Sequence, residues 1–278
     1  MCKVNDIRQL RAISKDIRTD VVNSLASAGS GHLGGSLGLA DIFTVLYHRI
    51  LNHNPQEPNW ALRDRLILSI GHVAPVLYAA LASCGYFPKQ ELLTLRKFGS
   101  RLQGHPGRDH GLPGIELSAG SLGQGLSVAV GMALAAKADG GPWRVFSVHG
   151  DGELQEGSIW EAAMSASHYN LDNLIAIVDR NYCQIDGRTS SVMEIEPLAQ
   201  KWEAFGWDVK HCNGNSIEEL VEVLELPSTK GKPRVIIAKT LMGQGVASIT
   251  DDYRWHGKAP SVQEAAQFIA EINSYYTE

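Results

Sequence analysis

Apolar residues recur along the chain at two spacings, which together predict alternating helices and strands. Near the start, Ile7, Leu10, Ile17, Val21 and Leu25 recur at helical spacing, and Gly29 can end that helix. Short apolar runs typical of buried strands occupy residues 65–70, 144–150, 173–179, 207–212 and 234–240. Further helices are expected at 39–51, from 73 to about 84, at 88–99, 159–169 and 198–205, and from 216 onward. Residues 104–125 are rich in Gly, Pro and His and indicate an extended loop.

Strands that alternate with helices predict an α/β fold with a doubly wound, mostly parallel sheet and helices on both faces. Ser216 and Glu219, and again Ser261 and Glu264, have the spacing of a capping box at a helix start. No repeat, low-complexity tract or linker interrupts the pattern. Residues 1–278 are therefore predicted to form one domain, with a C-terminal helix at about 261–276.

Composition narrows the class of protein. The 278 residues carry a net charge of -5, with 20% charged and 44% hydrophobic residues, which argues against disorder and against bulk nucleic-acid or anionic-membrane binding. The N-terminus lacks the apolar core of a signal peptide, and the glycines, serines and Gln124 of residues 117–136 make a poor membrane span. The four cysteines show no CxxC motif and no paired spacing. They are therefore expected to be free thiols in a cytoplasmic protein: Cys2, Cys84, Cys183 and Cys212.

Polar residues follow two strands that should be neighbours in the sheet. Asp151, between Gly150 and Gly152, follows one strand, and Asn181 follows the next. Ligands of such sheets bind beyond the carboxyl ends of the strands, and glycine lets the backbone approach a phosphate closely. Magnesium prefers oxygen ligands, so Asp151, Asn181 and a nearby backbone carbonyl suit a magnesium-bound diphosphate. A Gly-Asp-Gly turn alone is common, but this order of strand, turn, helix, strand and asparagine is much rarer.

The segment GDGELQEGSIWEAAMSASHYNLDNLIAIVDRNYCQIDG resembles the thiamine-diphosphate motif, in detail that of the transketolase family. GSGHLGGSLGLAD, LSIGHVAPVLYAAL, LQGHPG and LPGIELSAGSLGQGLSVAVGMALA resemble that family too, in order over residues 7–260. The resemblance implies thiamine diphosphate and a divalent metal, Mg²⁺ or else Ca²⁺ or Mn²⁺, held by Asp151, Asn181 and the carbonyl of Cys183. The other implied cofactor contacts are His72 beside the diphosphate, Gly120, Ser121 and Leu122, Gly150, and the backbone of Gly152 and Glu153.

Four histidines beside glycines are candidates for proton transfer, which histidine performs near neutral pH: His32, His72, His105 and His256. Taken singly, a Gly-His pair more often means an ordinary loop histidine, and that interpretation is given to His48, His53, His110, His168 and His211. The resemblance assigns His32 and His256 to the reacting carbonyl and the cofactor centre, and His105 to the sugar hydroxyls. Glu156 fits the acidic start of a helix, and the resemblance places it in a carboxylate network that links two cofactor sites across a subunit interface.

The resemblance also implies that half of the active site lies on another chain. Transketolases are roughly twice as long, and their second half carries a pyrimidine-binding domain with the activating glutamate and the arginines that bind sugar phosphates. We therefore expect the N-terminal, diphosphate-binding subunit of a split transketolase. Its partner would be a separate C-terminal, pyrimidine-binding subunit in an α2β2 assembly. The expected reaction moves a two-carbon ketol unit from a ketose, or its phosphate, to an aldose or its phosphate.

Alternatives remain open. Leu33 and the Gly35-Ser36 pair resemble 1-deoxyxylulose-5-phosphate synthase more than transketolase. The segments LQEG and GSLGQG, in contrast, resemble transketolase more. A thiamine-dependent subunit that decarboxylates a 2-oxo acid is a second alternative. A non-catalytic subunit with the same fold is a third, against which Asp151, Asn181 and the four histidines argue. A chain cut from a longer protein would also give this length.

Overall fold

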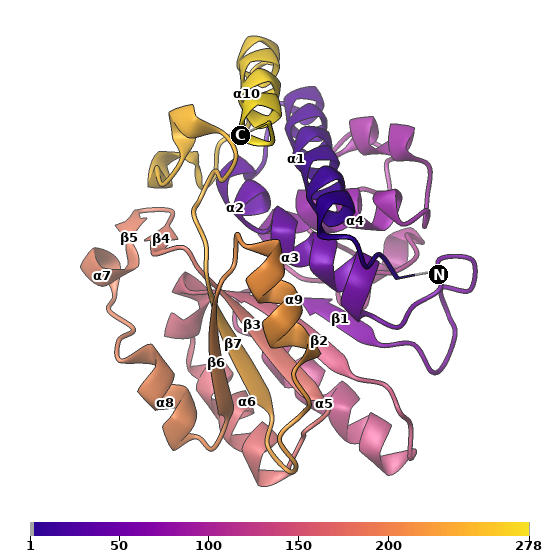
Figure 1. Ribbon diagram of the computed structural model, residues 1–278, viewed down its shortest axis with the longest axis vertical. Coiled ribbons are helices and arrows are strands. Elements are labelled where there is room, and N and C mark those ends of the chain that lie inside the picture. The colour runs from indigo at the N-terminus through magenta and orange to yellow at the C-terminus, as the bar shows by residue number, and fades with distance from the viewer. Residues whose placement is uncertain (1–2, 278) are drawn as a thin grey trace.

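The computed structural model describes residues 3–277, so Cys2 lies outside the described residues. Its centre is a five-stranded sheet in the order β1-β2-β3-β7-β6, and every pairing between neighbouring strands is parallel (Figure 1). The strands are β1 (Arg65–Leu68), β2 (Val145–Gly150), β3 (Leu174–Arg180), β6 (Asp208–Asn213) and β7 (Arg234–Lys239). A small antiparallel hairpin, β4 (Cys183–Gln184) and β5 (Gly187–Arg188), follows β3.

Helices cover both faces of the large sheet because successive strand residues point to opposite sides. Phe146 and Ile175 join one apolar cluster, whereas their neighbours Val145 and Ala176 join the other. The first cluster includes residues of α1 (Ile7–Ala28), α2 (Leu33–Gly38), α3 (Ala40–Val45), α4 (Ala74–Ser83), α9 (Ile217–Glu225) and α10 (Val262–Tyr275). The second includes residues of α5 (Gly125–Ala138), α6 (Gly157–His168) and α8 (Leu198–Ala204). The predicted doubly wound, parallel α/β fold is therefore confirmed.

Two predicted helices differ from the structure. The helix expected at 39–51 begins earlier, as α2, and continues through α3 into a π-helical turn at Leu46–Ile50. This glycine-rich start packs closely on a later loop, where a Cβ at Gly34 would come within 2.5 Å of the Met242 side chain, so the contact requires glycine. The helix expected at 88–99 is only a 3-10 helix at Lys89–Thr94.

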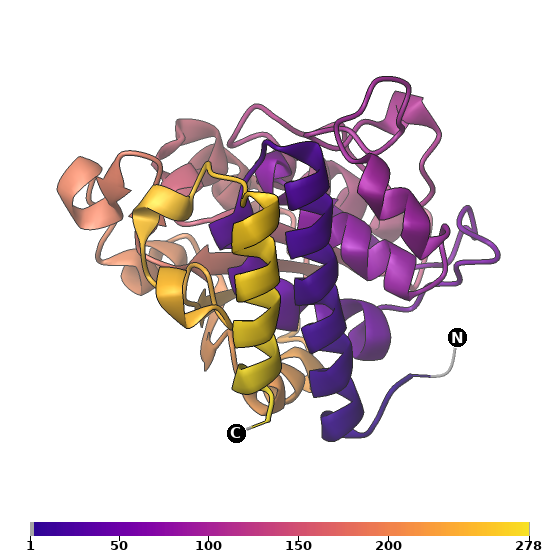
Figure 2. The ribbon, with the colours of Figure 1, turned by 90° about the horizontal axis from the view of Figure 1, so that it is seen from above.

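The first and last helices lie side by side, and they support the loop between β7 and α10 (Figure 2). Arg18 of α1 is fully buried and forms an ion pair with Asp41 of α3 at 2.6 Å. Its guanidinium also donates to the hydroxyl of Tyr276 and, at 3.0 Å, to the carbonyl of Gln244. This one side chain therefore connects both terminal helices to the loop that carries His256.

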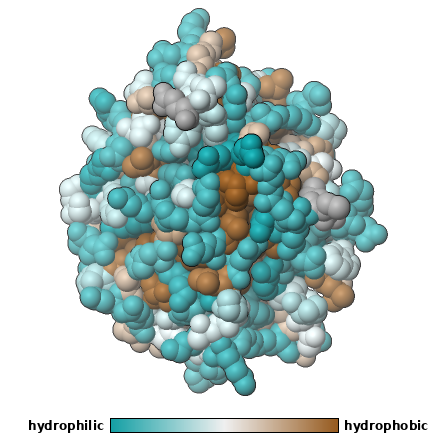
Figure 3. All heavy atoms as spheres, viewed as in Figure 1, coloured by the Kyte–Doolittle hydropathy of each residue, from teal (hydrophilic) through white to brown (hydrophobic). Residues whose placement is uncertain are grey.

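The surface seen in Figure 3 is mostly hydrophilic, and apolar side chains show there only in small groups. Among the helices of residues 3–277, none has both the length and the apolar character that crossing a bilayer requires. The hairpin β4–β5 and the short helix α7 (Thr189–Val192) project at one edge of the molecule, beyond the carboxyl ends of the strands (Figure 1).

Candidate active site

A cavity of about 380 Å³ opens at the carboxyl ends of β2 and β3, the edge at which the sequence predicts a ligand. Ten of the predicted site residues line it: His72, Leu122, Gly150, Asp151, Gly152, Glu153, Glu156, Asn181, Cys183 and His256. The register of the sheet explains their proximity, because Gly150 pairs with Asp179 on the neighbouring strand. The turn after β2 and the turn after β3 therefore face the same space.

Asp151 is held rigidly at the floor of this cavity. Its Oδ2 accepts hydrogen bonds from Arg180 Nη1 at 2.9 Å and from the backbone N–H of Tyr182 at 2.7 Å, and its Oδ1 accepts from Gly152 N–H at 2.8 Å. Burial raises the pKa of Asp151 to about 6, although Arg180 opposes that rise. The residue is 1% exposed and its hydrogen bonds hold the carboxylate in one orientation toward the cavity.

Asp179 orients Asn181, and sequence reasoning did not select Asp179 as a site residue. Asn181 Nδ2 donates to Asp179 Oδ2 at 2.8 Å, and Asn181 Oδ1 accepts from Cys183 N–H at 2.8 Å. Thr240 donates its hydroxyl proton to the other oxygen of Asp179. Burial raises the pKa of Asp179 to about 7. A single aspartate at the end of an apolar run carries no sequence signal that separates this role from an ordinary strand end.

These oxygens fit a hard divalent cation. Among residues 3–277, no group of three or more His, Cys, Asp or Glu side chains is placed to hold a metal ion. A cation at this edge must therefore combine the carboxylate of Asp151 with neutral oxygens, such as the Asn181 amide and a backbone carbonyl, and with oxygens of its ligand. Mg²⁺ is usually bound in this way, with few protein ligands and several phosphate or water oxygens.

The side chain of Glu153 forms a buried hydrogen-bond network, whereas the sequence predicted only a backbone contact for this residue. Its carboxylate is buried and accepts from Gly123 N–H at 2.8 Å, from the Ser69 hydroxyl and from Gly150 N–H at 3.3 Å. His149 Nδ1 lies 3.1 Å from Oε2 of the same carboxylate. Burial alone would raise the pKa of Glu153, but His149 and these hydrogen bonds hold it below its ordinary value. Glu153 thus fixes the loop that contains the predicted contacts Gly120, Ser121 and Leu122.

The four candidate histidines come together although they lie far apart in the sequence. The ring centroid of His32 is 5.0 Å from that of His72, 5.6 Å from that of His256 and 6.5 Å from that of His105. Burial, reinforced by the neighbouring imidazoles, lowers the pKa of His32 to about 4 and that of His72 to about 3. Within residues 3–277, the buried Nδ1 atoms of His32 and His256 have no hydrogen-bond partner.

The remaining predicted residues lie around this cluster. A Cβ at Gly120 would lie 3.9 Å from His105, so the loop with Ser121 and the loop with His105 meet at the outer end of the site. Glu156 lines the cavity at the start of α6 but is exposed and makes no side-chain cap. Ile70, Gln155, Gln184 and Ile185 also line the cavity and were not predicted. The roles of the predicted residues stay predictions.

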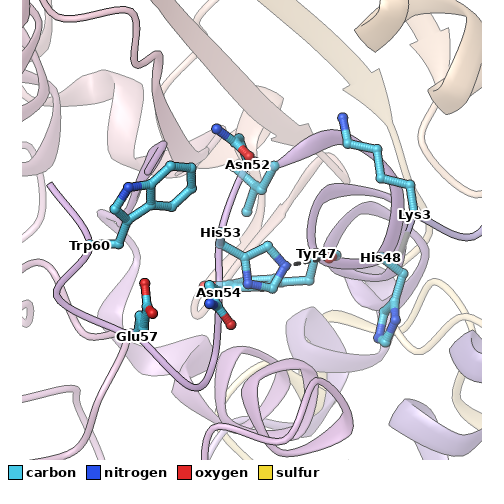
Figure 4. Close-up of a pocket in the computed structure, with 9 residues that line it drawn as sticks. Lys3, Tyr47, His48, Asn52, His53, Asn54, Glu57 and Trp60 are labelled. Atoms are coloured by element: carbon cyan, nitrogen blue, oxygen red, sulfur yellow. Dashed lines mark hydrogen bonds between the residues drawn. The ribbon is translucent and has the colours of Figure 1, made fainter. Parts of the chain in front are cut away.

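A second cavity, of about 310 Å³, lies beside the segment that leads into β1 and contains His48 and His53 (Figure 4). His53 Nε2 lies 2.7 Å from the carbonyl of Tyr47, and its Nδ1 lies 3.0 Å from the hydroxyl of Tyr86. His48 Nε2 lies 2.8 Å from the hydroxyl of Ser83. These contacts fit the interpretation of both residues as ordinary, hydrogen-bonded histidines, in contrast to the unpartnered Nδ1 atoms of His32 and His256.

Comparison with known proteins provides independent information about the family. Residues 9–272 match the family described as "Transketolase, thiamine diphosphate binding domain". An apulose-4-phosphate transketolase subunit of Actinobacillus succinogenes is 44% identical over 266 residues, which cover 95% of this chain and 96% of the relative. A 6-deoxy-6-sulfo-D-fructose transketolase subunit of a Clostridium species is 45% identical over 232 residues, which cover 83% of this chain and 84% of the relative.

Solved structures agree with these sequence matches. Transketolase of Campylobacter jejuni superposes with a TM-score of 0.89 and 33% identity over 96% of this chain, which is 43% of that protein. Transketolase of Leishmania mexicana superposes with a TM-score of 0.87 and 32% identity, over 96% of this chain and 44% of that protein. The chain therefore spans less than half the length of the solved transketolases, but nearly the full length of the relative from Actinobacillus succinogenes.

Proposed function

The chain belongs to the transketolase family through its thiamine diphosphate-binding domain, and we propose that it is the N-terminal subunit of a split transketolase. In this proposal residues 1–278 form one diphosphate-binding domain. A separate pyrimidine-binding subunit completes each active site, in an α2β2 assembly. The pair transfers a two-carbon ketol unit from a ketose to an aldose. Relatives that are named as transketolase subunits match this chain almost end to end, which supports the division into two chains.

One observation carries the proposal. A single cavity contains the oxygen atoms that suit a cation-bound diphosphate, with His72 and His256 on its wall and His32 beside both rings. Ile185 also lines the cavity, yet its side chain remains 62% exposed. A complete binding site for the aromatic rings of thiamine would bury such a residue. The cavity therefore needs a second wall, which the proposed partner supplies.

Asp151, Asn181 and the carbonyl of Cys183 would hold Mg²⁺, or Ca²⁺ or Mn²⁺, against the diphosphate, and the backbone around Gly150 and Gly152 leaves room for it. Thiamine diphosphate, when bound, supplies the electron sink that cleavage of a carbon–carbon bond beside a carbonyl requires.

The histidines would bind and protonate the substrate. Since their pKa values are lowered, His32 and His256 are neutral near pH 7, and a neutral imidazole both donates and accepts a hydrogen bond. Their unpartnered Nδ1 atoms can therefore exchange protons with the oxygens of a sugar, and His105 would contact its hydroxyls.

The substrate class is proposed from the relatives' names. Apulose 4-phosphate carries a phosphate, and 6-deoxy-6-sulfo-D-fructose carries a sulfonate. We therefore propose that this enzyme acts on a ketose with a strongly acidic terminal group. This class is wider than the phosphates of the common pentose pathway.

Co-expression with the product of the neighbouring gene tests the proposal. The purified pair, supplied with Mg²⁺ and thiamine diphosphate, should transfer two carbons from a ketose phosphate to an aldose. Each chain alone should be inactive. Full activity of this chain alone would exclude a split site, and release of carbon dioxide from pyruvate by the pair would indicate a decarboxylating enzyme instead.

A further inference from the structure

Arg96 lies beside the active-site histidines, at the outer end of the cluster. A Cβ at Gly104 would come within 2.6 Å of its guanidinium carbon, and a Cβ at Gly31 would come within 3.6 Å of its Nε. The guanidinium therefore occupies the space that a side chain at Gly104 would need, and it lies within van der Waals reach of Gly31. Since Gly31 and Gly104 directly precede His32 and His105, the positive charge lies next to both imidazoles.

Arg96 has an unfavourable backbone conformation. Its φ of +60° lies in the left-handed region, which residues other than glycine seldom adopt. Its N–H donates to the carbonyl of Leu102 at 2.9 Å, which closes the loop leading to His105. Non-glycine residues held in such conformations concentrate at functional sites.

The charge of Arg96 has no partner of its own. Within residues 3–277, its guanidinium makes no hydrogen bond or ion pair, and the side chain is exposed. Nearby cations differ: Arg101 forms an ion pair with Glu91 at 2.6 Å, and Lys97 donates to Ser27 Oγ at 2.9 Å. Burial, followed by the charge of Arg96, lowers the pKa of His105. An unpaired cation next to two imidazoles at the mouth of the site can bind an anion.

We propose that Arg96 binds the acidic terminal group, a phosphate or a sulfonate, of the sugar substrate. This inference rests on the proposed function, because it extends the same site outward. His72 lines the cavity, His32 lies beside it, and the exposed residues His105 and Arg96 follow toward solvent. A ketose whose carbonyl lies at His32 would extend its far end to Arg96. The chain would thus contribute to recognition of the acidic group itself rather than leave it wholly to the partner.

The test compares Arg96→Met with Lys97→Met in the reconstituted holoenzyme. With D-fructose 6-phosphate as donor, Arg96→Met should raise KM about 10- to 100-fold, the usual effect of losing a charge-assisted hydrogen bond. With the neutral ketose L-erythrulose, it should leave KM nearly unchanged. Arg96→Lys should give an intermediate KM for the phosphate, since lysine keeps the charge without the paired donors. Lys97→Met should match the wild type with both donors.

A binding measurement separates this inference from the proposed function. Calorimetric titration of the holoenzyme with D-fructose 6-phosphate, with 6-deoxy-6-sulfo-D-fructose and with D-fructose needs no turnover. Tighter binding of either acidic sugar, lost in Arg96→Met, supports the inference even if no ketol transfer is found, and the tighter of the two identifies the preferred group. If Arg96→Met weakens acidic and neutral sugars equally, or changes neither, Arg96 only shapes the loop and the inference is wrong.

Discussion

Asp151 is the side chain on which the proposed cation site most depends, and Asp151→Asn tests it with little change of shape. The amide keeps one acceptor oxygen for Tyr182 N–H but removes the charge that a divalent cation requires. We expect Mg²⁺-dependent binding of thiamine diphosphate to the reconstituted pair to weaken at least about 10- to 100-fold, the effect that loss of a residue supporting a metal ligand already has. Asp139→Asn, an exposed change at the end of α5, is the matched control. Unchanged cofactor affinity in Asp151→Asn would remove the metal assignment.

Glu153 and Glu156 are three residues apart and should behave oppositely in a stability experiment. Glu153 is buried and accepts from two backbone N–H groups, so Glu153→Gln would turn a donor amide toward existing donors. The expected loss is about 2–4 kcal/mol in the free energy of unfolding. Glu156 is exposed, and Glu156→Gln should change this free energy by less than about 0.5 kcal/mol. Urea unfolding of the isolated chain measures both, and equal effects would refute the buried-network interpretation.

At the scale of elements, alanine substitutions at two glycines should change the stability of the chain in opposite directions. Gly29 ends α1 with φ +67°, its N–H donating to the carbonyl of Leu25 at 2.9 Å, and a Cβ there would meet nothing within 4 Å. Gly29→Ala should therefore lower stability by about 1 kcal/mol through strain alone. Gly131, inside α5, also has open space around a Cβ, and Gly131→Ala should raise stability by about 0.5–1 kcal/mol. Thermal unfolding of both variants should show melting points that move in opposite directions.

Elements were predictable where the local pattern and the tertiary environment agree. Buried parallel strands are apolar on both faces, and β2, β3 and β7 stand out in the sequence for that reason. The helix at 33–38 was not predicted because glycine has low helix propensity, whereas in the structure Gly34 is needed for close packing on Met242. A contact between residues so far apart in the chain cannot be predicted from the local sequence.

The candidate site was predictable only in part, for a similar reason. Asp151 and Asn181 follow neighbouring strands, so topology alone brings them together. Glu153, in contrast, bonds to Ser69 and to Gly123, which are 84 and 30 residues away in the sequence. Such partners become visible only once the chain is folded.

The molecule as a whole leaves one side of its active site open. Exposed apolar side chains concentrate around the hairpin β4–β5 and α7: Tyr182, Ile185, Val192 and Met193. Tyr182 follows Asn181 directly and Ile185 lines the same cavity, so the open side adjoins the proposed cation site. Large apolar side chains at a cavity mouth are typical of a surface that another protein covers. The proposed partner subunit would therefore bury this segment and close the cavity in one event.

Ile185→Ser tests that coupling of assembly and site closure. Since Ile185 is mostly exposed in this chain, the substitution should leave the melting temperature of the isolated chain nearly unchanged. It should weaken association with the partner about 10-fold or more, measured by sedimentation, because a central apolar contact is lost. Leu62→Ser, a similarly exposed change in the segment that leads into β1, should leave association intact. If both variants bind the partner as tightly as the wild type, the second wall of the cavity does not contact Ile185, and the partner must approach the histidine cluster from another side.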